Sequence, residues 1–121
     1  MATTKSDGPG KPETVICLFR VRKDKEDEFR ALVERHWPTL HRLGLTTAEP
    51  SKVYRGADRS GGPLWVEIFT WKDGRAAHVA HEHPEVAAIW EPMETCVEER
   101  KGVAKWEFPN VQPVSLSHAR A

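Results

Sequence analysis

The stretch AAHVAHEHPEVAAIWEPMETCVEERKGVAKWEFP, residues 76–109, constrains the fold of this chain more than any other feature. It predicts an amphipathic helix that is broken at His83-Pro84, because proline disfavours helical geometry in the residue before it. A short strand over 103–108 follows, after Gly102 ends the helical region. One strand, one helix and two further strands precede this stretch. The resulting order, β-α-β-β-α-β, predicts an α+β domain.

The strand patterns contain apolar residues on both faces. Residues 14–22, TVICLFRVR, are β-branched and aromatic, which is typical of a central strand covered on both sides. Residues 50–57 and 64–71 flank the turn-forming sequence DRSGGP and predict a β-hairpin. In LWVEIFTW, Glu67 falls on the otherwise aromatic face of alternate residues and needs a partner. We expect that partner to be Arg55, on the other arm of the hairpin.

The first helix is predicted over residues 24–43, with Asp24 as its N-cap and Gly44 at its C-terminal end. Its apolar stripe recurs at spacings of three and four residues and includes His36. We expect Pro38 to kink this helix. A short helical segment over 75–82 should precede the break at Pro84.

Composition limits the possible functions. The 121 residues, a length typical of one domain, carry 18 basic and 18 acidic side chains, so the balanced charge argues against a nucleic-acid or anionic-membrane partner. We expect a flexible segment over 1–13, one domain over 14–109 and a tail over 110–121. The lead-in lacks the apolar core of a signal peptide, and Cys17 and Cys96 fit two buried, reduced thiols. We therefore expect a cytoplasmic protein.

Three segments resemble the dimeric α+β barrel superfamily, and within it the antibiotic biosynthesis monooxygenase-like domain: VICLFRV at 15–21, WVEIFTWKD at 65–73 and AAHVAHEHPEVAAIWEPM at 76–93. The resemblance implies a ferredoxin-like monomer with a four-stranded antiparallel sheet. It also implies a homodimer whose sheets pack face to face, and a small-molecule pocket between helices and sheet. The chain lacks the late second-helix histidine of the haem-degrading relatives, since no histidine lies between Glu85 and Lys105.

The resemblance makes a cofactor-independent monooxygenase acting on a small aromatic or polyketide-like molecule one interpretation. Substrate carbanions react with oxygen directly, so the protein needs only to bind, deprotonate and exclude water. Imidazoles titrate near neutral pH and suit the role of base. Candidate catalytic residues are His36, His78 and His81. Flat aromatic ligands stack on aromatic walls, and the candidate substrate-binding residues are Trp37, Trp65, Phe69, Trp71 and Trp90.

Other interpretations stay open. The chain contains no GxGxxG, P-loop or GxSxG motif, and we expect no cofactor. We assign no metal ligands, although the sequence leaves open whether His78, His81 and His83 bind a metal, because no second cluster with ligand spacing accompanies them. A non-catalytic small-molecule-binding or stress-related protein, or another activity on the same fold, would use the same pocket. The sequence does not decide whether the protein is a catalyst.

Overall fold

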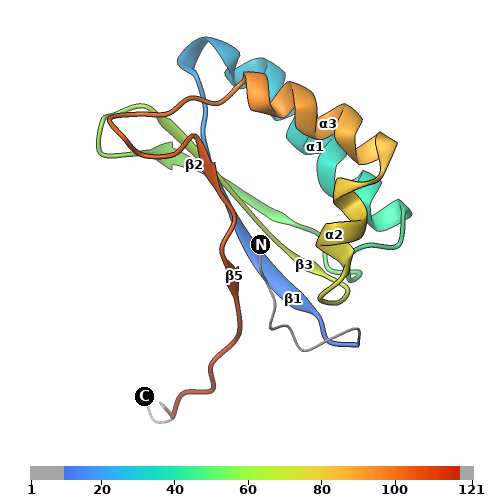
Figure 1. The fold of residues 1–121 in the computed structure, drawn as a ribbon. Helices are drawn as coiled ribbons and strands as arrows, with labels where there is room; N and C mark the ends of the chain where they lie inside the picture. The colour runs from blue at the N-terminus through green and yellow to red at the C-terminus, as the bar shows by residue number, and fades with distance from the viewer. Residues whose placement is uncertain (1–9, 118–121) are drawn as a thin grey trace.

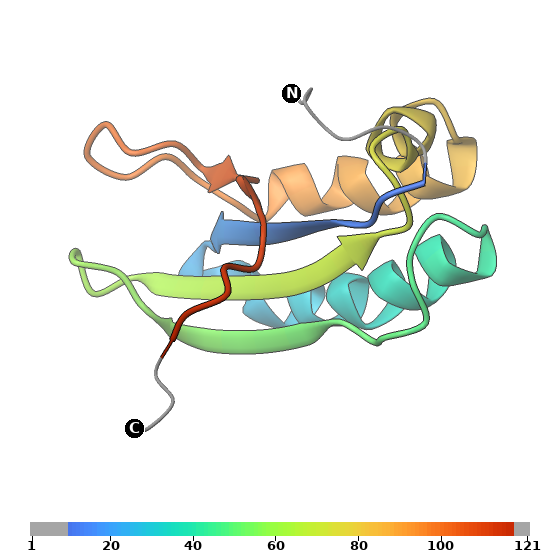
Figure 2. The same ribbon diagram turned by 90° about the horizontal axis from the view of Figure 1, so that it is seen from below.

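The structure is a computed structural model that describes residues 10–117. One antiparallel sheet is covered on one face by a layer of helices (Figures 1 and 2). The sheet has the order β2-β3-β1-β4, and β5 also pairs with β1. This arrangement confirms the predicted ferredoxin-like α+β class. The elements are β1 (Glu13–Arg20), a 3-10 turn η1 (Lys23–Lys25), α1 (Glu26–Arg42), β2 (Lys52–Ala57), β3 (Pro63–Trp71), α2 (Ala76–His81), α3 (Pro84–Thr95), β4 (Trp106–Glu107) and β5 (Asn110–Val111).

The two central strands, β1 and β3, pair along their whole length, from Glu13 opposite Trp71 to Arg20 opposite Leu64. Their side chains alternate strictly between buried and half-buried. The buried positions face the helices and form one core with Phe29, Leu40, Ile89 and Met93. The period-two pattern of the sequence therefore grouped the side chains of each strand into its two faces correctly, and the structure places the helices over one of those faces.

The start of α1 differs from the prediction. Asp24 was predicted as the N-cap, but it lies within η1, and Lys25 occupies the cap position without a side-chain hydrogen bond. The backbone N–H of Lys25 instead donates to the Arg22 carbonyl, which tightens the chain just before the helix. The helix continues through Pro38, and Gly44 follows its end with φ of +77°, a conformation that glycine adopts without a steric penalty.

The break between the later helices lies where proline predicts it. α2 ends before His83, which has extended backbone geometry and caps α3, its ring Nδ1 accepting the Glu85 N–H at 3.1 Å. The end of α3 was predicted at Gly102 and is wrong, because the helix stops at Thr95 and Val97 then bridges to Val21. Of the predicted strand 103–108, only Trp106 and Glu107 form a strand, β4. Lys101 and Gly102, both at positive φ, make a turn just before this segment.

Glu67 does not pair with Arg55, and that prediction was wrong. In the observed register Arg55 lies opposite Trp65 and reaches Glu26, at 2.7 and 2.8 Å. Glu67 lies two residues further along β3, opposite Val53, and is only 1% exposed, beneath α1. Its partner is His36 of that helix.

None of the helices in residues 10–117 combines the length and the apolarity that crossing a membrane requires.

Candidate functional site: a cavity beside a buried glutamate–histidine pair

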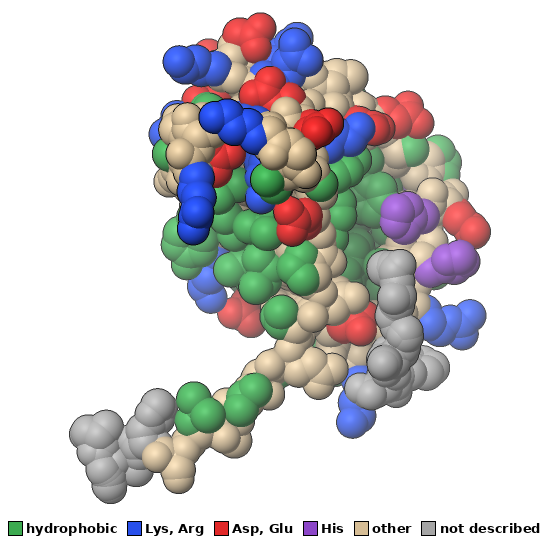
Figure 3. All heavy atoms as spheres, turned by 60° about the vertical axis from the view of Figure 1, so that its left-hand side comes forward, with side chains coloured by type: hydrophobic (Ala, Val, Ile, Leu, Met, Phe, Trp, Pro, Cys, Tyr) green, Lys and Arg blue, Asp and Glu red, His purple; other side chains and the backbone are tan. Residues whose placement is uncertain are grey.

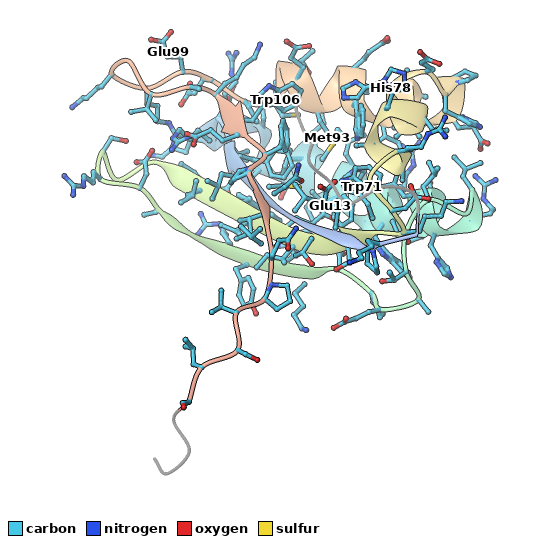
Figure 4. All side chains as sticks on the ribbon, turned by 60° about the horizontal axis from the view of Figure 1, so that its bottom comes forward. Glu13, Trp71, His78, Met93, Glu99 and Trp106 are labelled. Carbon is cyan, nitrogen blue, oxygen red and sulfur yellow. The ribbon has the colours of Figure 1, made fainter. Side chains whose placement is uncertain are left out.

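A cavity of about 150 Å³ lies between the sheet and the helices α2 and α3. Figure 4 shows Trp71 and Met93 in the interior of this region, with Trp106 at the edge. The lining is almost entirely apolar and aromatic, as in most small-molecule sites. The lining residues are Val15, Cys17, Phe19, His36, Phe69, Trp71, Ala77, His81, Trp90, Met93, Trp106, Phe108 and Asn110.

The volume limits the size of a ligand. A cavity of about 150 Å³ lined by apolar side chains holds a benzene-sized molecule in another protein, where such a site stays free of water. The cavity here therefore suits one aromatic ring in its present shape. Its edge is formed by β4, Phe108 and β5, and Phe108 is 45% exposed, so the cavity communicates with solvent along this edge.

His36 is the deeply buried histidine on the cavity wall. It lies on the apolar stripe of α1, which turns its side chain toward the sheet, and it is 3% exposed. Its Nδ1 lies 2.7 Å from Oε1 of Glu67, and its Nε2 lies 2.9 Å from the indole nitrogen of Trp90. The edge of Phe69 packs against its ring, with centroids 5.6 Å apart. Both ring nitrogens are thus engaged and the orientation of the ring is fixed.

The two hydrogen bonds define the tautomer of His36. An indole N–H can only donate, so Nε2 of His36 must be the acceptor in its bond with Trp90. The proton of the neutral ring is then on Nδ1 and is donated to Glu67 Oε1. Nε2, the unprotonated nitrogen, faces the Trp90 indole, and both residues line the cavity.

Only one of the two carboxylate oxygens of Glu67 has a hydrogen-bond partner among the described residues. Its Oε1 accepts from His36, whereas Oε2 is buried and meets no donor among the residues that the structure describes. An unpaired buried carboxylate oxygen costs free energy, and such groups concentrate at functional sites. The cavity thiol of Cys17, opposite Glu67 on β1, has its pKa raised well above the usual value, first by burial and then by the charge of Glu67. This thiol stays protonated near neutral pH and is a poor nucleophile.

The structure brings five of the eight predicted site residues to this cavity: His36, Phe69, Trp71, His81 and Trp90. His81 is exposed and packs edge-on against Trp90, with centroids 4.9 Å apart, so it lies at the mouth rather than inside.

His78, Trp37 and Trp65 lie elsewhere. His78 is on the helical side of the molecule (Figure 4), with a side chain 79% exposed and 3.5 Å from Glu82. Trp37 and Trp65 border a separate hollow beside β2. Trp65 is an internal anchor, because its indole donates to Glu26 at 2.7 Å. Hydrogen bonds from Arg55 first, and then from Trp65, lower the pKa of Glu26, against the opposing effect of burial.

Within residues 10–117, no group of three or more His, Cys, Asp and Glu side chains is arranged to hold a metal ion. His83 caps α3 and His78 faces solvent, so these two histidines do not converge with His81.

Sequence reasoning missed several wall residues, namely Cys17, Phe19, Met93, Trp106, Phe108 and Asn110. The last three come from β4, from β5 and from the residues between these strands, and nothing in their local pattern marks them as wall residues. Glu67, by contrast, did give a signal, since an acidic residue on an aromatic strand face requires a buried partner.

No model of a known protein family matches the chain, and no curated protein sequence matches it. Several solved structures are similar to the structure of this chain. A variant of SnoaB, a cofactor-independent oxygenase from Streptomyces nogalater, superimposes with a TM-score of 0.67 at 16% identity, over 89% of this chain and 98% of SnoaB. Rv0793 from Mycobacterium tuberculosis gives a TM-score of 0.64 at 16% identity, over 88% and 99% of the two chains. A protein of Nitrosomonas europaea, proposed to be an antibiotic biosynthesis monooxygenase, gives 0.64 at 11% identity, over 88% and 94%.

At these identities the likeness concerns the fold alone. The chain shares its fold with SnoaB, Rv0793 and the Nitrosomonas europaea protein.

Proposed function

We propose that this protein is a cofactor-independent monooxygenase that acts on a small hydroxylated aromatic molecule bound in the cavity beside His36. The observation that carries the proposal is the position of His36, a buried histidine with an unprotonated Nε2 that lines an apolar cavity of about 150 Å³. SnoaB, a cofactor-independent oxygenase, has the same fold. The volume favours a single-ring substrate over a polycyclic one.

The chemistry needs only the substrate and dioxygen. His36 takes a proton from the substrate, and the resulting anion supplies the electrons that reduce dioxygen. One oxygen atom enters the product and the other leaves as water, so substrate and dioxygen balance without an added reductant. The apolar wall excludes bulk water and keeps the anion from being reprotonated before it reacts.

The outer face of the sheet supports a homodimer. The side chains of Ile16, Leu18, Leu64, Val66 and Ile68 point away from the helices and are only half-buried. Tyr54, next to Val66, is 56% exposed. Figure 3 shows hydrophobic side chains gathered on one side of the molecule below charged loops. A second copy that packs its own sheet there would cover this surface.

The fold also supports a second candidate, a protein that binds a small aromatic molecule without transforming it. The favouring observation is that the Trp90 indole already occupies Nε2 of His36, the atom a base would use.

As for location, Cys17 and Cys96 are both free and buried, which is compatible with the reducing environment of the cytoplasm.

Oxygen consumption tests the proposal. Purified protein without added metal or flavin would be mixed with single-ring hydroquinones and, for comparison, with an anthrone. We expect substrate-dependent uptake and incorporation of one atom from ¹⁸O₂, reduced about a hundredfold or more in His36→Gln. His78→Gln, a change at an exposed histidine outside the cavity, is the matched control and should keep full activity. Absence of uptake with every substrate, or equal uptake by His36→Gln, would reject the proposed reaction.

A further inference from the structure

The hydrogen bond from Trp90 to His36 engages the ring nitrogen that would act as the base. Nε2 of His36 accepts the indole N–H at 2.9 Å, so it has no lone pair free for a ligand. A proton arriving on Nε2 would face another N–H, and two donors repel. Proton transfer to His36 therefore requires the Trp90 indole to withdraw first.

The position of Trp90 allows this movement. The residue lies on α3 and is only half-buried, and its ring borders both the cavity and the exposed His81. A group placed between the two nitrogens needs two hydrogen bonds of ordinary length, which requires the nitrogens to be about 5 Å apart. The indole must therefore retreat by about 2 Å.

A hydroxyl group matches this gap. It can donate its proton to Nε2 of His36 and accept the indole N–H on its oxygen at the same time. A carbonyl has no proton to donate, and an alkyl group can do neither. The cavity that His36 and Trp90 border is also lined by Phe69, Trp71, Met93 and Trp106, which suit a flat ring attached to that hydroxyl.

Glu67 makes the proton transfer favourable. When the ligand O–H bond breaks, the electron pair stays on oxygen and the proton forms a bond to Nε2, which leaves a positively charged imidazolium. This ring lies 2.7 Å from a carboxylate that is 1% exposed and whose Oε2 has no donor in the described part of the chain. A carboxylate behind a histidine holds the tautomer and stabilises the imidazolium in the serine protease triad by the same principle.

We infer that the cavity recognises a phenol or enol hydroxyl, inserted between His36 Nε2 and Trp90 Nε1, and that Glu67 is the positioning residue that enables His36 to take its proton. This inference rests on the proposed function for the location of the site, and it adds the place where the ligand hydroxyl binds and the roles of Glu67 and Trp90.

The test uses 4-nitrophenol, a single-ring probe whose phenol and phenolate forms absorb at different wavelengths. The fraction ionised in the complex is measured against pH for the wild-type protein, Glu67→Gln and the control Trp37→Phe, which lies outside the cavity. We expect bound probe to ionise more readily than free probe in the wild type and in the control. Glu67→Gln keeps an acceptor for Nδ1–H but loses the charge, so it should bind neutral phenol with similar affinity and lose at least about tenfold in ionisation, equivalent to one pH unit.

A second readout uses the unaltered protein. With ¹⁵N-labelled histidine, saturating 4-nitrophenol should convert His36 from the form protonated only on Nδ1 to the form protonated on both nitrogens. Lack of binding, or a Glu67→Gln variant that ionises the probe as well as the wild type, would overturn the inference. Neither measurement needs oxygen or turnover. Ionised probe without oxygen uptake on any hydroquinone would reject the monooxygenase and leave this inference intact.

Discussion

Nδ1 of His36 lies 2.7 Å from Oε1 of Glu67, and the side chains of both residues are at least 96% buried. The bond connects the helical layer to the centre of the sheet, because His36 belongs to α1 and Glu67 to β3. An apolar pair would fill the same space without the cost of burying a carboxylate. The pair is therefore better explained by chemistry at the adjoining cavity than by stability, and this explanation can be tested by substitution.

Glu67→Gln should leave the protein at least as stable as the wild type, because the amide keeps an acceptor for His36 and is cheaper to bury than a carboxylate. Glu67→Ala removes that acceptor and should cost about 1–3 kcal/mol in the free energy of unfolding. Urea denaturation of the two variants measures both effects. A Gln variant that is destabilised as strongly as the Ala variant would show that the charge of Glu67 serves stability.

Filling the cavity with a larger side chain should weaken the binding of 4-nitrophenol without unfolding the protein. Ala77 lines the cavity and is half-buried, so Ala77→Phe would place a ring in the ligand space. We expect the affinity for 4-nitrophenol to fall by about tenfold or more, which corresponds to about 1.4 kcal/mol. Ala88 is exposed on α3, and Ala88→Phe is the matched control that should bind normally. Equal titration curves for the two variants would place the ligand elsewhere.

The sequence predicted the fold better than the site. Alternation within LWVEIFTW was enough to group the side chains of β3 into its two faces, because side chains in a strand alternate with a fixed period, although it did not show which face the helices cover. The same pattern showed that Glu67 needs a partner but did not identify it. His36 lies 31 residues away on another element, and only the packing of α1 on the sheet brings the two together. Similarly, no local pattern shows that Trp90 and Trp106 reach the cavity whereas Trp65 does not.

Gly62 should be intolerant of any side chain. A Cβ atom at this position would lie 2.6 Å from Cζ of Arg100, whose side chain donates to Asp58, at 2.9 Å, and to the carbonyls of Val21 and Pro63. Gly62→Ala must displace this guanidinium, and we expect it to lower the free energy of unfolding by about 1–3 kcal/mol.

The control for this substitution is Gly56→Ala, where a Cβ would meet nothing within 4 Å and where we expect a change within about 0.5 kcal/mol. Thermal or urea unfolding measures both. In an Arg100→Ala background the cost of Gly62→Ala should largely disappear, and an undiminished cost would show that the clash with Arg100 is not its cause.

Asp58 should make the free energy of unfolding depend on pH. Hydrogen bonds from Ser60 and then from Arg100 lower the pKa of this carboxyl well below its ordinary value of 3.8. A carboxyl with a lowered pKa in the folded protein binds protons more weakly there than in the unfolded chain. Its stabilising contribution is therefore complete above the ordinary value and is lost as the pH falls below it, toward the folded pKa.

The comparison is between the wild type and Asp58→Asn in urea unfolding at about pH 7 and about pH 3. The wild type should have a larger free energy of unfolding than Asp58→Asn at the higher pH, and the difference should be smaller at the lower pH. Asp24→Asn serves as the control, because the Asp24 side chain is 76% exposed. An advantage of the wild type over Asp58→Asn that is the same at both pH values would contradict this role for Asp58.

The most direct measurement of the central claim is a crystal structure of the protein with a single-ring hydroquinone, obtained without oxygen. The account predicts the ring in the cavity among Phe69, Trp71 and Met93, with one hydroxyl oxygen within hydrogen-bonding distance of both His36 Nε2 and the withdrawn Trp90 indole nitrogen. An empty cavity with the bond between Trp90 and His36 still closed at 2.9 Å, or a ligand bound at another surface, would contradict it.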